Sequence, residues 1–174
     1  LPRPCTRCGP GLLIFSEMWG VAAKKREMAE NYARHGWCAV AANMSWRSEF
    51  TGVVPFDQAD KAWQRLQVFD FDKSADDCRT AVQWLRASPH CNGKIAAIGF
   101  CMGGRIAFLA AARAGVNAAI GLYALGIAKH LDEARNMAVP LQLHYGLSAE
   151  HIPKSEIDAV AAAASGNNNI EIQP

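Results

Sequence analysis

The sequence predicts an α/β fold in which a mostly parallel sheet is covered by helices on both faces. Short apolar runs suited to strands alternate with helical stretches along the chain. The runs are apolar at consecutive rather than alternate positions, which is typical of parallel strands buried on both faces. No repeat or low-complexity stretch interrupts this alternation. Crossover helices between such strands give a sheet covered by helices.

The length and composition suit a single domain. With 174 residues, of which 51% are hydrophobic, the chain can bury one sizeable core. Residues 1–10 are rich in proline and show no periodic pattern. We therefore expect an irregular tail over 1–10 and one domain over 11–174.

The first elements are expected before residue 47. The apolar run 11–15 predicts a buried strand, and 37–42 predicts a second one. Between them, residues 22–35 have an amphipathic pattern that ends at Gly36. The apolar side of this helix is expected to consist of Met28, Ala29, Tyr32 and Ala33.

The middle of the chain contains one weak segment and one clear helix. Residues 48–70 have a weak pattern, and a connection of this length is usually a functional loop or holds a short helix of its own. Residues 72–88 predict a helix that Pro89 ends. Its apolar face consists of Ala75, Cys78, Val82 and Leu85. Cys78 is therefore expected in the core rather than in a reactive site.

The most informative stretch surrounds Cys101. The turn at Asn92-Gly93 leads into an apolar strand at 95–98, which stops at Gly-Phe-Cys-Met-Gly-Gly, and an apolar helix follows over 102–114. A tight turn from strand to helix leaves little room for side chains around its apex, so glycines flank the one that projects. This is the logic of a nucleophile elbow, with Cys in the position often held by Ser. A helix N-terminus would also favour the thiolate form of the cysteine. Taken alone, Cys101 could equally be a small core residue.

The last third of the chain continues the alternation. Strands are expected at 117–122, 140–145 and 169–173, and helices at 127–137 and 153–165. In an open parallel sheet, ligands bind at the carboxyl ends of the strands. Side chains that follow expected strands are therefore candidates for a site: Glu17, Arg47, Cys101 and the loop after Gly146. From their own segments, Glu17 and Arg47 could also be solvated surface groups.

Charge and cysteine content exclude several classes. The net charge is only +2 without a basic block, so we expect no nucleic-acid partner. No apolar run is long enough to span a membrane, and the first residues do not resemble a signal peptide, so we expect no membrane partner and a cytoplasmic location. Six irregularly spaced cysteines suit reduced thiols. Cys5 and Cys8 form one C-x-x-C spacing, which leaves a redox or metal site as a weaker alternative.

Five segments together resemble the dienelactone hydrolases, a branch of the α/β-hydrolases. In order along the chain they read SEMWG (16–20), NMSWR (43–47), FDFDK (69–73), GFCMGG (99–104) and HYG…HIP (144–153). The resemblance covers residues 11–174 and is specific, since order and spacing both agree. It implies an α/β-hydrolase fold that is incomplete at both ends.

The resemblance also implies a chemistry. Cys101 would attack the carbonyl carbon of an enol lactone or related ester, with the backbone N–H groups of Met102 and Met18 as the oxyanion hole. Glu17 would hold or help activate the thiol. The substrate would be a small lactone or ester carrying a carboxylate, contacted by Arg47 and Tyr123. No metal or organic cofactor is implied.

The sequence departs from the family pattern at the other two members of the catalytic triad. The family's orienting Asp corresponds to Ala149, with Glu150 next to it as a candidate substitute. The family's His belongs to a Gly-His element beyond the last expected strand, and the sequence ends before that element. His151 is a weaker candidate for the base. A non-catalytic remnant or small-ligand-binding module therefore remains the alternative to a hydrolase.

Overall fold

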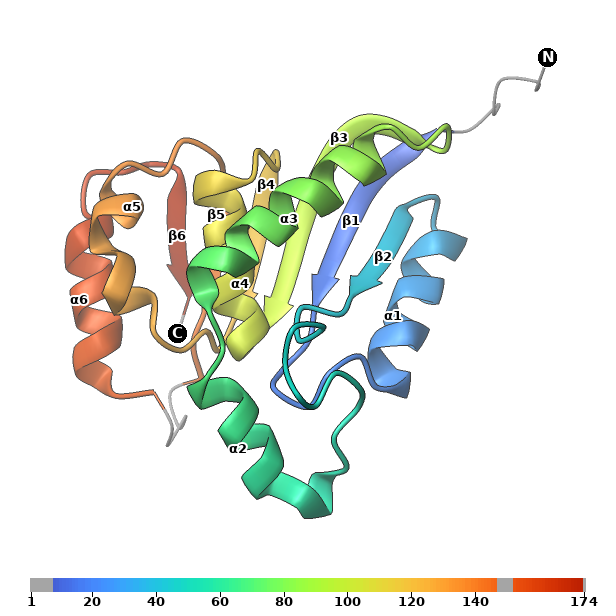
Figure 1. Ribbon diagram of the computed structural model, residues 1–174. Coiled ribbons are helices and arrows are strands. Elements are labelled where there is room, and N and C mark those ends of the chain that lie inside the picture. Colours follow the sequence, from blue (N-terminus) through green and yellow to red (C-terminus); the bar gives the residue numbers. More distant parts are fainter. Residues whose placement is uncertain (1–7, 147–151, 174) are drawn as a thin grey trace.

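The computed structural model describes residues 8–146 and 152–173 (Figure 1). Its centre is a six-stranded sheet in the order β2-β1-β3-β4-β5-β6, and every adjacent pair is parallel. The strands are β1 (Gly9–Phe15), β2 (Cys38–Ala42), β3 (Cys91–Phe100), β4 (Ala118–Leu122), β5 (Leu141–His144) and β6 (Ile170–Gln173). The predicted fold class is confirmed.

Helices connect the strands and cover the sheet. They are α1 (Ala23–Arg34), α2 (Ala59–Gln67), α3 (Phe71–Arg86), α4 (Met102–Arg113), α5 (Leu131–Arg135) and α6 (Lys154–Ala164), with 3-10 turns η1 (Phe56–Gln58) and η2 (Ile127–His130). α3 and α4 pack side by side over β1 and β3 (Figure 1). The chain steps from β1 to β2 in one direction and from β3 to β6 in the other. Because crossovers are right-handed, α1 covers the face opposite to α4.

Several boundaries differ from the prediction. β1 begins at Gly9, because the Gly9 N–H donates to the His90 carbonyl (3.2 Å) and Gly9 pairs with Cys91 across a register shift. The expected turn at Asn92-Gly93 lies inside β3, where Gly93 has φ +86°. The weak segment 48–70 holds η1 and α2, which agrees with the expected short helix.

The two faces of α1 also differ from the prediction. Lys25, which was expected on the polar side, is buried, whereas Ala33 is exposed. Nearby β2 is only half-buried along its length, although burial on both faces was expected. Its position at the sheet edge explains this, because an edge strand has a neighbour on one side only.

The core lies between the sheet and the α3–α4 layer. Phe15, Ile106 and Phe108 are fully buried there, and Cys78 packs among them from α3, as predicted. None of the helices in residues 8–146 and 152–173 is both long and apolar enough to cross a membrane. The carboxyl ends of the strands all point to the same edge of the sheet, near α2 (Figure 1).

Candidate active site

Cys101 occupies the turn between the central strand β3 and helix α4. Its backbone has φ +54° and ψ −116°, a region that non-glycine residues rarely adopt. The Cys101 N–H donates to the Leu122 carbonyl (2.9 Å), and its own carbonyl accepts the first N–H bond of α4, from Gly104 (2.9 Å). Backbone bonds on both sides thus hold a strained residue in place, as is common at functional sites.

The glycines around Cys101 are required by the closeness of the backbone. A Cβ atom on Gly99 would lie 1.8 Å from the Gly103 carbonyl oxygen, and one on Gly103 would lie 2.3 Å from that of Phe15. Neither position has space for a methyl group, and both obstacles are backbone atoms that cannot move aside. The steric argument for an elbow at Cys101 is therefore confirmed.

The Cys101 thiol is not activated in the way that its position suggested. Burial raises the pKa of the Cys101 thiol, the Met102 N–H lowers it, and the negative charge of Glu17 raises it further. The net direction is upward. The expectation that the helix N-terminus favours the thiolate is thus wrong for the resting site, because desolvation outweighs the N–H group.

Glu17 lies in the same cavity as Cys101 and already has two partners. Lys25 Nζ donates to Glu17 Oε1 at 2.8 Å, and the Tyr123 hydroxyl donates to the same oxygen at 3.2 Å. Lys25 also lies 4.0 Å from the centre of the Phe100 ring. The ammonium group of the buried Lys25 therefore compensates the negative charge of Glu17. The sequence had placed this lysine on the polar side of its helix.

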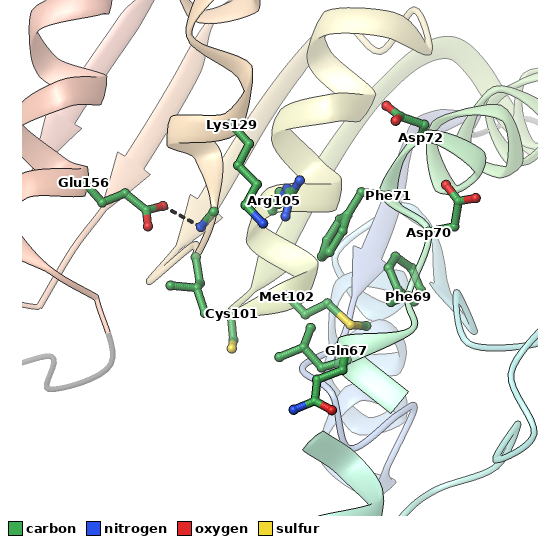
Figure 2. A pocket seen from close by; sticks show the side chains of 13 residues that line it. Gln67, Phe69, Asp70, Phe71, Asp72, Cys101, Met102, Arg105, Lys129 and Glu156 are labelled. Carbon is green, nitrogen blue, oxygen red and sulfur yellow. Dashed lines mark hydrogen bonds between the residues drawn. The ribbon is translucent and has the colours of Figure 1, made fainter. Parts of the chain in front are cut away.

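Two cavities meet at Cys101. One, of about 490 Å³, is mostly apolar and contains Glu17, Met18 and Tyr123. The other, of about 600 Å³, is polar and is shown in Figure 2; Met102 and Arg105 line it. Cys101, Leu66 and Leu125 belong to both. The structure thus brings together five of the predicted site residues: Cys101, Glu17, Met18, Met102 and Tyr123.

Arg47 lies apart from this group. Its Nη2 forms an ion pair with Asp77 Oδ1 at 2.7 Å, and its guanidinium stacks over the Trp46 ring at 4.1 Å. It lines a third cavity, of about 280 Å³, which shares Phe69 and Asp70 with the polar cavity but does not include Cys101. The structure therefore gives Arg47 a carboxylate partner from the protein itself.

Some predicted residues lie outside the described part of the chain. These are Glu150 and His151, with Ala149 beside them, and Cys5 of the C-x-x-C pair. Cys8 is described, and its Sγ lies 3.2 Å from the Pro89 carbonyl oxygen. Within residues 8–146 and 152–173, no three His, Cys, Asp or Glu side chains are grouped so that they could hold a metal ion.

Sequence reasoning missed Lys25 and Arg105. A signal for Arg105 was present, since it is the one charged residue within the apolar run of α4 and stands four positions after Cys101. No comparable signal marked Lys25, because Lys24, Lys25 and Arg26 are adjacent and only the rotation of α1 selects one of them.

Comparison with known proteins gives a consistent result. The family model described as "Dienelactone hydrolase family" matches residues 2–173. A carboxymethylenebutenolidase of Pseudomonas putida is 28% identical over 172 residues, which are 97% of this chain and 73% of that protein. Carboxymethylenebutenolidase 1 of Cupriavidus pinatubonensis is 27% identical over 176 residues, with 99% and 75% covered.

A solved structure shares the fold. A dienelactone hydrolase-like promiscuous phosphotriesterase from metagenomic libraries superposes with a TM-score of 0.81 at 22% identity, over 97% of this chain and 70% of that one. At this identity the likeness concerns the fold alone. The parallel sheet with its covering helices is therefore a known architecture.

Proposed function

Because the chain belongs to the dienelactone hydrolase family, we propose that it cleaves an enol lactone or related carboxylic ester through an acyl-enzyme on Cys101. One observation carries the proposal: Cys101 has a strained backbone at the apex of a turn from strand to helix and borders both cavities of the site. A side chain in this geometry projects from the sheet edge while the backbone N–H groups around it stay available to a substrate.

The first half of the reaction transfers the acyl group. The thiol is protonated in the resting site, so attack has to be coupled to removal of its proton, for which Glu17 is the nearby carboxylate. A C–S bond forms, and negative charge develops on the carbonyl oxygen, where the N–H groups of Met102 and Met18 would stabilise it. One such donor is worth about 10²–10³ in rate.

The second half releases the product. Collapse of the tetrahedral intermediate breaks the ester C–O bond, and the departing oxygen takes the proton from Glu17. In a lactone this step opens the ring. Water then attacks the thioester, which yields a carboxylic acid and returns a proton to Cys101. This step needs a base for the water, and Glu150 and His151 are the candidates from the sequence.

The substrate is expected to carry a carboxylate. Arg47 is the residue that the family resemblance assigns to this group, and Tyr123 is expected to contact the substrate beside Glu17. Because Arg47 already pairs with Asp77 through Nη2, a substrate anion would have to share its guanidinium with that carboxylate.

The direct test is to follow acylation of Cys101. An activated 4-nitrophenyl ester should give a burst of nitrophenolate, together with a mass increase of the acyl group on the peptide that contains Cys101. Cys101→Ala should show neither. An acyl group found on another residue, with Cys101 unmodified, would refute the assignment.

A second candidate is a small-ligand-binding module without turnover. Ala149 at the position of the family's orienting Asp favours it. In a serine triad, replacement of the Asp lowers the rate by about 10⁴. A thiol depends less on a general base for its activation, because it is more acidic than a hydroxyl. A stoichiometric burst that is followed by no further release would support this candidate, whereas steady release would support the hydrolase.

A further inference from the structure

We propose that Arg105, with Lys129 beside it, is the site that binds the carboxylate of the substrate. This inference rests on the proposed ester chemistry at Cys101 and names the charged end of the substrate and its receptor. Arg105 lies in the polar cavity (Figure 2), not in the cavity of Arg47. Nothing in the resemblance assigned a role to Arg105.

The burial of Arg105 is unusual. Arg105 is 8% exposed and belongs to a helix in which the ten positions from Met102 to Ala111 are all buried. Its guanidinium carbon lies 3.7 Å from the centre of the Phe71 ring, so one face of the cation is stacked. Burying a charge is costly unless it is paired or used. Because one face of the guanidinium is covered by Phe71, the N–H groups in its plane are the ones that can form hydrogen bonds.

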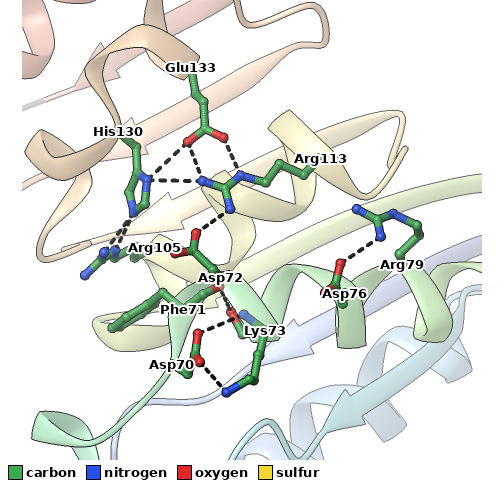
Figure 3. Close-up of polar contacts among 11 residues, drawn as sticks. Asp70, Phe71, Asp72, Lys73, Asp76, Arg79, Arg105, Arg113, His130 and Glu133 are labelled. Atoms are coloured by element: carbon green, nitrogen blue, oxygen red, sulfur yellow. Dashed lines mark hydrogen bonds and ion pairs between the residues drawn. The ribbon is translucent and has the colours of Figure 1, made fainter.

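Two of these N–H groups converge on one neutral acceptor. Arg105 Nε and Nη2 lie 3.1 Å and 2.8 Å from His130 Nε2 (Figure 3). The nitrogen Nε2 must therefore be unprotonated, and Nδ1 carries the hydrogen and faces Glu133 Oε2 at 3.2 Å. Burial and the positive charge of Arg105 lower the pKa of His130, which agrees with this tautomer.

The charge of Arg105 consequently has no hydrogen-bonded carboxylate among the described residues. Its Nη1 group has no hydrogen-bond partner there either, and it lies against Gly126, where a Cβ would come within 2.7 Å of it. A histidine lone pair orients the guanidinium but does not neutralise it. The structure thus holds a fixed cation on the wall of a cavity with N–H donors to spare.

Two of the three acids of the cavity are paired with other cations, whereas the third, Glu156, is hydrogen-bonded among the described residues only to a backbone N–H and its charge acts on Arg105 from a distance. Asp70 pairs with Lys73 at 2.9 Å, Asp72 pairs with Arg113 at 2.6 Å, and Glu156 accepts the Gly126 N–H. Lys129, by contrast, is exposed and has no ion pair within the described chain. Figure 2 shows its side chain beside Arg105. The cavity therefore offers two cations to an incoming anion.

The position of Arg105 suits a substrate attacked by Cys101. Arg105 lies in the first turn of α4, next to the turn that holds Cys101, and the Arg105 N–H shares the Cys101 carbonyl with Gly104. Both side chains line the 600 Å³ cavity. An ester whose carbonyl carbon is at Cys101 can therefore extend a carboxylate toward Arg105, while its apolar part enters the second cavity.

The test compares two nearly isosteric esters. One is the mono-4-nitrophenyl ester of adipic acid, and the other is its methyl-capped diester, which lacks the charge; the burst of nitrophenolate reports acylation of Cys101. Arg105→Gln should slow acylation by the charged ester about 30-fold and by the capped ester about 2-fold or less, since a hydrogen bond between charged groups is worth about 1.5–3 kcal/mol. Arg79→Gln removes an exposed arginine and is the matched control.

A second readout does not depend on acylation. Free adipate should slow alkylation of Cys101 by iodoacetamide in the unmodified chain and in Arg79→Gln, and this protection should be lost in Arg105→Gln. If adipate protects but neither ester acylates Cys101, the anion site stands and the proposed hydrolase function fails. If acylation proceeds and Arg105→Gln affects both esters equally, or if only Arg47→Gln removes the preference for the charged ester, the inference is overturned.

Two further variants apply if Arg105→Gln does not fold, as judged by circular dichroism. Arg105→Lys keeps the charge but loses the planar fork and should reduce the preference for the charged ester about 5-fold. Lys129→Gln changes an exposed side chain and should reduce it about 3-fold. An unchanged preference in both variants would contradict the proposal.

Discussion

The two cavities that meet at Cys101 differ in the chemistry of their side chains, although three residues line both of them. The polar cavity contains a buried arginine, an exposed lysine, two carboxylates that are paired with other cations, and Glu156, which accepts a backbone N–H. The apolar cavity has Met18, Trp19 and Ile152 on its walls, with Glu17 and Tyr123 as its polar groups. Cys101 thus lies between a cavity suited to charged groups of a ligand and a cavity suited to its apolar groups.

Under the proposed ester chemistry, this difference would let the thiol of Cys101 select and position an ester. An apolar wall alone separates substrates weakly, because one methylene group changes the discrimination by about 1–3 kcal/mol. A fixed cation would add orientation, since only one end of the proposed substrate carries a complementary charge. The proton transfer that we propose for Glu17 would take place on the other side, where Glu17 contacts Lys25 and Tyr123.

The largest expected effect concerns Cys101, one of the three residues that line both cavities. Cys101→Ala should reduce acylation by any ester by more than about 10³-fold. Cys78→Ala should leave acylation nearly unchanged, because Cys78 is a fully buried core residue whose burial raises its pKa to about 12. The nitrophenolate burst measures both. Equal losses in the two variants would contradict the separation of the site from the core.

The second prediction concerns the support of the apolar cavity. Arg65 is 1% exposed and donates to three carbonyl oxygens, those of Phe50, Gly52 and Met18. Arg65→Met should lower the free energy of unfolding by about 3 kcal/mol, because buried carbonyl groups lose their donors. Urea unfolding measures this change. Arg79→Met, at an exposed ion pair, should change it by less than about 0.5 kcal/mol.

The third prediction separates two roles of Glu17. Glu17→Gln removes a negative charge that raises the thiol pKa and leaves Lys25 nearby, so alkylation of Cys101 by iodoacetamide at pH 7.5 should become several-fold faster. Acylation by esters should become slower, since the proton acceptor is lost. Rates that change in the same direction would show that Glu17 only tunes the thiol.

The fourth prediction concerns the pH dependence of the thiol itself. Because burial and Glu17 raise the pKa of Cys101, little thiolate is present at neutral pH. The alkylation rate of Cys101 should still be rising with pH where that of N-acetylcysteine has levelled off. Peptide mass spectrometry after timed alkylation provides the rates. A plateau at or below the pH of the free thiol would contradict the burial argument.

The smallest effect is expected on the polar side, at His130. Its lowered pKa means that the unfolded chain binds more protons than the folded chain in the range below the ordinary histidine pKa. The free energy of unfolding should therefore fall as the pH decreases through that range. His130→Gln should flatten this dependence, and an unchanged slope in this variant would contradict the prediction. Urea unfolding at pH 5 to 8 supplies the comparison.

The sequence was most informative where backbone geometry leaves few choices. The glycines around Cys101 predicted the elbow, because 1.8 Å to a carbonyl excludes any side chain at Gly99. The strands of the sheet were predicted by the same kind of constraint, as burial on both faces demands continuous apolar runs. The expected burial on both faces was wrong for several strands: β2 and β6, at the two edges of the sheet, are only partly buried, and buried positions in β4 and β5 alternate with less buried ones.

The sequence was least informative about the partners of charged side chains. Arg47 was expected to be open to a substrate but pairs with Asp77, which lies thirty positions away. The direction in which the pKa of Cys101 shifts was also missed, because the local argument included the helix N-terminus but omitted burial and the charge of Glu17. Such effects depend on distances between segments that a one-dimensional pattern does not contain.

The strand order has a consequence for how the protein is made. Of the six strands described, β1 is the earliest in the chain, but it lies inside the sheet, where Leu12 pairs with Ala39 on one side and with Ala96 on the other. At about 5–20 residues per second, a ribosome needs roughly 4–16 s to proceed from the first of these strands to β3. During this interval one edge of an apolar strand has no native partner, so the nascent chain is most prone to mispairing before the residue that bears the thiol has been added.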